Sequence, residues 1–148
     1  MDKKIKIAVD AMGGENSPTK IIDGIKISIK NNPNNFFLLY GKQDIIQKHL
    51  FKNDIVKKSC EIVNSEDIVQ DNESPLTGVK RGKNSSMWKS LKSQKNNMAD
   101  ITLSAGNTGA LLVMSKMILN TLDGIDKPAL AGLWPNKRGT NIVLDLGA

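Results

Sequence analysis

The chain is poor in the two residue types that supply many enzymes with nucleophiles, bases and metal ligands. Its 148 residues include one cysteine, Cys60, and one histidine, His49. A single cysteine excludes an internal disulfide and a cysteine-based zinc site, and its place in an apolar strand pattern favours a buried, unreactive thiol. A single histidine on an expected helix argues against a Ser-His-Asp triad. The sequence therefore offers no ligand cluster for a metal ion.

Aromatic residues and long apolar runs are also scarce. Aromatic side chains make up 4% of the chain, which argues against the stacking of bases from single-stranded nucleic acid. No run approaches the roughly 18 apolar residues that a membrane span needs, and the N-terminus lacks the form of a signal peptide. We expect a cytoplasmic protein that binds no nucleic acid.

What the chain does contain is positive charge. Lys and Arg number 21 against 15 Asp and Glu, for a formal net charge of +6. Such a balance favours an acidic partner, an anionic lipid surface or nucleic acid. Lys, Asn and Ile are heavily used throughout, however, and such a bias often reflects genome composition. The charge alone is therefore weak evidence for a partner.

Apolar strand patterns alternate with amphipathic helical patterns along the chain. This alternation predicts an α/β fold with a mostly parallel sheet and helices on both faces. Ser17 is the expected N-cap of the first helix and Pro18 its first helical residue. The expected strands cover 4–10, 36–40, 57–63, 101–104, 129–134 and 141–146, and the expected helices cover 18–30, 44–51, 75–83, 86–93 and 108–120. Because the last strand ends in a glycine turn with no covering helix, we interpret residues 1–148 as the N-terminal portion of a single domain truncated at its C-terminus.

Three glycine-bearing turns follow expected strands, at 10–14, 104–109 and 145–148. Ligands of open α/β sheets bind outside the carboxyl ends of the strands, so three such turns at one edge indicate a binding site. None of them has the glycine spacing of the dinucleotide fingerprint or the Walker P-loop.

The turn at 104–109 passes directly from a strand into a long helix. Gly106 permits close approach to the backbone, and Gly109 lets the helix approach the strand. Asn107 or Thr108 can cap the helix, which would leave amides free for a phosphate or an oxyanion. The alternative is a capped turn that binds nothing.

A compact basic cluster with two adjacent hydroxyls lies at residues 80–86. Arg and Lys supply charge and Ser supplies directed donors, a mixture that suits phosphate. The alternative is a solvated helix end.

Taken together, five blocks make the chain resemble the bacterial acyl-carrier-protein:phosphate acyltransferases of phospholipid synthesis, in their N-terminal part. The blocks are residues 7–14, 85–87, 104–111, 124–130 and 144–148, which occur in family order at family-like spacing. Glu15 departs from the family's usual Asp, and Lys80 and Gly82 stand where Arg and a basic or polar residue are common. Lys80 lacks the bidentate fork of Arg, which affects the expected phosphate geometry.

The resemblance implies transfer of a long-chain fatty acyl group from acyl carrier protein to inorganic phosphate, giving acyl phosphate for phosphatidic acid synthesis. It implies a Rossmann-like three-layer α/β/α fold akin to the isocitrate and isopropylmalate dehydrogenases, with the C-terminal half missing here. It also implies a homodimer, peripheral association with the membrane and a downstream membrane acyltransferase, and neither a metal nor an organic cofactor.

A thioester is already activated, so the expected site holds a phosphate and stabilises an oxyanion. We expect a catalytic group of Asn107, Ser104 and Asp10. Asp10 orients a base, positions a cation or caps its own turn, and Ser104 is a weak candidate nucleophile because no His activates it. The expected phosphate- or substrate-binding residues are Gly13, Gly14, Lys80, Arg81, Lys83, Ser85, Ser86, Gly106, Thr108 and Gly109.

Two other functions stay open at this point. The chain could be a non-catalytic module that docks acyl carrier protein through its basic surface, and such a module should not bind phosphate. It could also be a phosphate-binding, dehydrogenase-like α/β enzyme, although it lacks the cofactor fingerprint. If the acyltransferase reading holds, we expect the isolated 148-residue chain to be inactive and marginally folded, because its last apolar strand has no cover.

Overall fold

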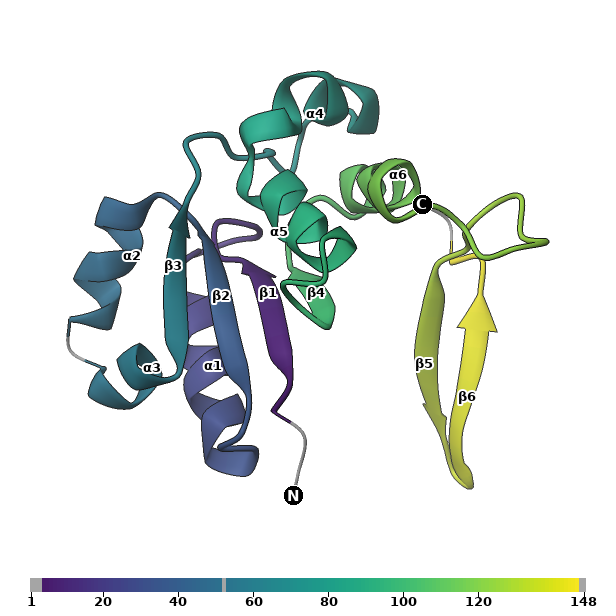
Figure 1. Cartoon of the computed structure of the whole chain (residues 1–148). Coiled ribbons are helices and arrows are strands. Elements are labelled where there is room, and N and C mark those ends of the chain that lie inside the picture. The colour runs from purple at the N-terminus through teal and green to yellow at the C-terminus, as the bar shows by residue number, and fades with distance from the viewer. Residues whose placement is uncertain (1–3, 52, 147–148) are drawn as a thin grey trace.

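The computed structural model describes residues 4–51 and 53–146, apart from the side chain of Arg81. Four parallel strands form one sheet in the order β3-β2-β1-β4 (Figure 1). The strands are β1 (Lys6–Asp10), β2 (Phe36–Gly41), β3 (Cys60–Asn64) and β4 (Ile101–Ser104). In the register of the sheet Asp10 pairs with Tyr40 on one side and with Ser104 on the other. The carboxyl ends of the two strands that bear Asp10 and Ser104 are therefore level.

Three helices cover one face of the sheet: α1 (Thr19–Asn31), α2 (Gln43–Leu50) and α3 (Asp54–Lys58). Ile22, Ile25 and Ile29 of α1 recur at helical spacing and are buried, in one cluster with Val9 and Leu39. Alternate residues of a strand point to opposite faces, so Val9 faces α1 whereas Asp10 faces away from it. Full burial of each such aliphatic side chain contributes about 1.5–3 kcal/mol.

The opposite face is covered by α5 (Ser86–Lys95), which packs across β1, β2 and β4. On the same side of the sheet, α4 (Pro75–Arg81) packs against the short 3-10 helix η1 (Gly82–Asn84) and α6 (Thr108–Leu119), and η1 and α6 pack against α5. Buried Met87 and Leu91 of α5 meet Met114 and Ile118 of α6. The expected three-layer α/β arrangement around a parallel sheet is thus confirmed for residues 4–119.

The strand order contains a switch point beside β1. The chain moves outward from β1 to β2 to β3, then returns to place β4 on the other side of β1. The loop after β1 leads to α1 on one face, and the loop after β4 leads to α6 on the other (Figure 1). Such a switch point opens a crevice outside the carboxyl ends of the two strands, which is the usual ligand position in open α/β sheets.

The last two strands do not join this sheet, contrary to the prediction. β5 (Ala131–Asn136) and β6 (Gly139–Leu144) form a separate antiparallel hairpin, drawn apart from the sheet in Figure 1. Only Lys137 and Arg138 separate the two strands, and so short a connection permits only antiparallel pairing. The sequence predicts both strands and the turn, but the prediction overlooked the antiparallel pairing that so short a turn imposes.

Three further elements differ from the prediction. The expected strand at 57–63 is shifted, because the chain is helical through Lys58 and β3 starts at Cys60. Ser17 does not cap α1: that helix begins at Thr19 with Pro18 as its N-cap, and Ser17 Oγ donates a hydrogen bond to the carbonyl of Gly13. The expected helix at 75–83 changes to 3-10 geometry at Gly82. In the described ranges no helix is both long and apolar enough to cross a bilayer.

Candidate functional site

The two glycine turns at the switch point pack directly against each other. A Cβ atom on Gly13 would lie 2.6 Å from Asp10 Oδ2, 2.9 Å from the Gly106 amide nitrogen and 3.0 Å from Ser104 Oγ. Gly14 has a positive φ of 84°, and a Cβ there would lie 2.6 Å from the Ala105 carbonyl oxygen. The space between the turns accommodates a backbone without side chains, which accounts for both glycines.

Asp10 lies beneath this contact and is 2% exposed. Its Oδ2 accepts a hydrogen bond of 2.8 Å from Ser104 Oγ, and its Oδ1 accepts one of 3.3 Å from the amide of Met12. Ser104 Oγ in turn accepts a hydrogen bond of 3.1 Å from the amide of Gly106. Asp10 therefore joins the turn after β1 to the turn after β4.

Ser86 adds a buried hydroxyl at the start of α5. Its Oγ is fully buried and makes no hydrogen bond of good geometry within the described residues, yet it faces the Asp10 carboxyl closely enough to favour the charged form. Burial raises the pKa of Asp10 above its ordinary value of 3.8, and the hydroxyls of Ser86 and Ser104 and the amides of Met12 and Gly13 oppose that rise. Five of the expected site residues thus form one cluster: Asp10, Gly13, Ser86, Ser104 and Gly106.

Asn107 caps α6, as one of the two sequence alternatives predicted. Its Oδ1 accepts a 2.9 Å hydrogen bond from the amide of Ala110. Its Nδ2 donates to the backbone carbonyls of Gln70, Asp71 and Glu73 at 3.3, 3.2 and 2.8 Å. Both polar atoms of the Asn107 side chain are therefore hydrogen-bonded within the protein, and they connect the loop before α4 to the start of α6.

The first two amides of α6 remain available. The amides of Thr108 and Gly109 have no hydrogen-bond partner in the part of the chain that the structure describes. Thr108 is exposed, whereas a Cβ on Gly109 would lie 2.7 Å from Cγ of Pro75, so Gly109 permits the close packing of α6 against α4. Free amides and the helix dipole at this end favour an anion.

The basic cluster lies on α4 and η1, which pack mainly against each other and against α5 and α6. Lys80 and Lys83 are exposed, and the side chain of Arg81 lies outside the described structure. Ser85 is not a free donor, because its Oγ donates to the Gly82 carbonyl at 2.6 Å and accepts from the Trp88 amide at 3.2 Å. The hydroxyls of the cluster are therefore buried, and its lysines are solvated.

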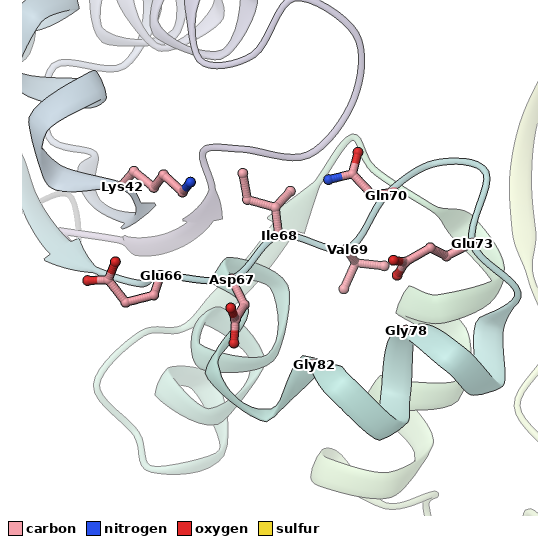
Figure 2. A pocket seen from close by; sticks show the side chains of 9 residues that line it. All are labelled: Lys42, Glu66, Asp67, Ile68, Val69, Gln70, Glu73, Gly78 and Gly82. Carbon is pink, nitrogen blue, oxygen red and sulfur yellow. The ribbon is translucent and has the colours of Figure 1, made fainter.

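A cavity of about 490 Å³ lies between α4 and the loop before it (Figure 2). Three carboxylate side chains and one lysine line it, so its charge does not suit a phosphate. The lining residues, labelled in Figure 2, are Lys42, Glu66, Asp67, Ile68, Val69, Gln70, Glu73, Gly78 and Gly82.

Sequence reasoning missed the loop at 65–73 as part of the site. The polar run before Ser74 and Pro75 marks it as a loop, but no local pattern shows that its carbonyls face Asn107. It also missed Met87, whose side chain packs under Gly106. The third expected turn begins after β6 in the separate hairpin, and Gly147 and Ala148 lie outside the described residues. Among those residues no group of three or more His, Cys, Asp or Glu could hold a metal ion.

Comparison with known proteins places the chain in a family. The sequence model of the family described as "Fatty acid synthesis protein" matches residues 5–148. A phosphate acyltransferase of Pelagibacter ubique is 54% identical over the whole chain, which covers 44% of that relative's length. Phosphate acyltransferases of Rhodopseudomonas palustris and Bradyrhizobium diazoefficiens are each 44% identical over the whole chain, which covers 42% of their lengths. The chain belongs to the fatty acid synthesis protein family and is homologous to phosphate acyltransferases, of which it spans less than half the length.

Proposed function

We propose that the protein transfers a fatty acyl group from acyl carrier protein to inorganic phosphate and releases acyl phosphate for phosphatidic acid synthesis. The homologues named phosphate acyltransferase support an acyltransferase of lipid synthesis. The structural observation that carries the proposal is the pair of free amides, of Thr108 and Gly109, at the start of α6 beside the switch point. A helix N-terminus in that position is suited to the phosphate, which is the substrate with the highest charge density.

The chemistry needs little besides binding and orientation. A phosphate oxygen attacks the thioester carbonyl carbon, the carbon–sulfur bond breaks, and the thiolate leaves and takes up a proton. The carbonyl oxygen becomes an oxyanion on the way, and a backbone amide that donates to it stabilises it. We assign the amides of Thr108 and Gly109 to one of the two anions, either the phosphate or the oxyanion.

The remaining site residues have supporting parts. Lys80, Arg81 and Lys83 supply positive charge that draws phosphate toward α6, because α4 packs on that helix. Gly13, Gly14 and Gly106 allow the two turns to meet, Ser85 caps the start of α5, and Ser86 faces the Asp10 carboxyl. Asn107 holds the start of α6, and we assign Ser104 and Asp10 to the hydrogen-bond network beneath it rather than to covalent catalysis.

The proposal extends to the complete protein. We propose that residues 1–148 are part of a single acyltransferase domain of the isocitrate and isopropylmalate dehydrogenase type. We also propose that the protein is a homodimer that associates with the membrane surface and passes acyl phosphate to a membrane acyltransferase. It uses no cofactor in this scheme, because the thioester supplies the driving force for transfer.

The test is a reaction with purified complete protein, acyl carrier protein loaded with a long-chain fatty acid, and radiolabelled phosphate. We expect labelled acyl phosphate, detected directly as labelled phosphate that extracts into organic solvent together with the fatty acyl chain. A Lys80→Gln, Lys83→Gln double variant should raise the KM for phosphate and leave the KM for the acyl donor unchanged. A change confined to the acyl donor, with a strong salt dependence, would place the cluster on the carrier-docking surface instead.

A further inference from the structure

The carboxyl group of Asp10 has no path to a substrate. Asp10 is 2% exposed, and Gly13 lies so close that even a methyl group there would collide with Oδ2 at 2.6 Å. Ser104 is partly buried, and its Oγ is engaged by both Asp10 Oδ2 and the Gly106 amide. The Asp10 carboxyl is therefore not placed to touch the phosphate or the thioester.

The hydrogen bonds of Asp10 lead instead to the two turns of the site. One carboxylate oxygen accepts from the amide of Met12, in the turn after β1. The other accepts from Ser104 Oγ, which accepts from the amide of Gly106, in the turn before α6. A serine hydroxyl has one proton to donate. Because that proton is held by Asp10, the lone pairs of Ser104 Oγ face the Gly106 amide.

The surroundings of the carboxyl group favour an acceptor and contain no compensating charge. The groups that face it are the hydroxyl of Ser104 on β4, the hydroxyl of Ser86 on α5, and the amides of Met12 and Gly13 in the following turn. All of these are uncharged donors, and none of the described residues places an ionic partner against it. A carboxylate has only acceptor oxygens to present to these donors, whereas an amide side chain would turn its NH₂ group toward some of them.

We propose that Asp10 is a positioning residue that acts through Ser104 to hold the Gly106 turn, and with it the first amides of α6, in the geometry that binds phosphate. This inference rests on the proposed function for its substrate. Removal of either Asp10 or Ser104 should release the Gly106 amide and misplace the amides of Thr108 and Gly109 relative to the anion.

The first test is a double-mutant cycle in the complete protein with Asp10→Asn, Ser104→Ala and the combined variant. Each single variant should raise the KM for phosphate at least tenfold, with little change in the KM for the acyl donor. The combined variant should be no worse than the more impaired single variant, because both residues act along one hydrogen-bonded path. Additive losses, or equal losses for both substrates, would overturn the inference.

The second test is the pH profile of kcat/KM for phosphate. The kcat/KM of wild type divided by that of Asp10→Asn should fall as pH decreases through the raised pKa of Asp10, because the protonated carboxyl is a poorer acceptor. The matched control Ser93→Ala removes a buried hydroxyl of α5 that the site does not use, and its ratio to wild type should not change with pH. A flat ratio for Asp10→Asn would contradict the inference.

A third measurement does not depend on activity. The amide proton resonance of Gly106 should move upfield in both Asp10→Asn and Ser104→Ala if it loses its hydrogen bond. An unchanged Gly106 resonance in both variants would overturn the positioning role even if acyl phosphate is formed. Conversely, if the resonance moves in both variants although the wild type forms no acyl phosphate, the hydrogen-bond path is supported and the proposed reaction is rejected. If Asp10→Asn fails to fold, Ser104→Ala alone decides, since it deletes one hydroxyl.

Discussion

At the scale of single residues, the site depends most on a glycine that has no room for a side chain. Gly13→Ala would place a methyl group 2.6 Å from Asp10 Oδ2 and 2.9 Å from the Gly106 amide nitrogen. One of the two turns must then move, at a cost of roughly 1–3 kcal/mol in the free energy of unfolding. We expect acyl-phosphate formation to fall by about two orders of magnitude, comparable to the loss of an oxyanion donor.

The chain provides its own control for that substitution. Gly24 lies in the exposed part of α1, and a Cβ there would meet nothing within 4 Å. Gly24→Ala should leave turnover unchanged and raise the free energy of unfolding by about 0.5–1 kcal/mol, because alanine favours a helix. Thermal unfolding and the labelled acyl-phosphate assay on both variants make the comparison. Equal activity in the two variants would mean that the turns tolerate a larger separation.

Cys60 is a residue for which sequence and structure agree on low reactivity. It is half-buried at the start of β3, and burial raises the pKa of its thiol to about 11. At pH 8 only about one thiol in a thousand would be ionised, since each pH unit below the pKa reduces the thiolate tenfold. Alkylation by iodoacetamide, followed by mass spectrometry, should be slow at pH 8 and rise steadily toward pH 11. A plateau below pH 9 would show that Cys60 has an ordinary or lowered pKa.

The pKa of Asp10 bears on stability as well as on function. Because its folded-state value lies above 3.8, the folded chain binds more protons than the unfolded chain in the interval between the two values. Stability contributed by this group therefore decreases as pH rises through that interval. Burial of Asp10 therefore costs stability near neutral pH, and the positioning role proposed above gives a reason for a carboxylate at this place.

At the scale of elements, one side chain connects two segments that are far apart in sequence. Asn107 Oδ1 caps α6, and Asn107 Nδ2 binds three carbonyls of the loop before α4. Asn107→Ala loses both functions and should lower the free energy of unfolding by about 1–2 kcal/mol from the cap alone. Asn107→Asp keeps the cap but removes the NH₂ donor and places a carboxylate against the carbonyls. We expect it to release the loop specifically, which faster proteolysis within 65–74 would report.

The outcome of these two variants distinguishes the roles. If Asn107→Asp is as well folded as wild type and its loop is equally resistant to protease, the contacts to the three carbonyls contribute little. If both variants lose the same stability, the loop contacts outweigh the cap. Phosphate affinity should fall in Asn107→Ala, because the first turn of α6 then frays where its amides are needed.

Elements with strong local signals were predicted well, and elements set by distant contacts were not. The isoleucine spacing of α1, the cap and proline at Ser74 and Pro75, and the strand at 101–104 follow local rules and were located correctly. The helical turn α3 was missed because its five residues carry an apolar pattern that is too short to separate helix from strand. Ser17 fits the rule for an N-cap, but its hydroxyl donates a hydrogen bond to the Gly13 carbonyl, a contact between turn residues.

The candidate site divides in the same way. The two glycine turns were found from the sequence because a strand that ends in glycine before a helix is a local pattern. That they touch, and that Asp10, Ser104 and Gly106 share one hydrogen-bonded path, follows from the strand order, which places β4 beside β1. The spacing of residues along the sequence does not reveal that strand order.

At the scale of the whole molecule, the structure consists of a covered sheet and an uncovered hairpin. Each face of the four-stranded sheet carries helices, and its buried side chains form continuous clusters. The hairpin of β5 and β6 exposes Leu133 by 76% and Ile142 by 71%, and these two residues pair across its strands. A two-stranded ribbon without a packed face is at best marginally stable in water.

This difference predicts how protection from hydrogen exchange varies along the 148-residue chain. Amides of β1 and β2 are bonded in the centre of the sheet between buried layers, so they should exchange most slowly. Amides of β5 and β6 are bonded only within the hairpin, so they should exchange within the dead time of a manual experiment. The difference does not come from strand length, because β5 and β6 are similar in length to β1 and β2. Exchange followed by mass spectrometry on peptides covering 36–41 and 131–144 makes the comparison within one sample. Slow exchange in 131–144 at low protein concentration would show that the hairpin is covered within a single chain, whereas protection that appears only as the concentration rises would show that a second copy covers it.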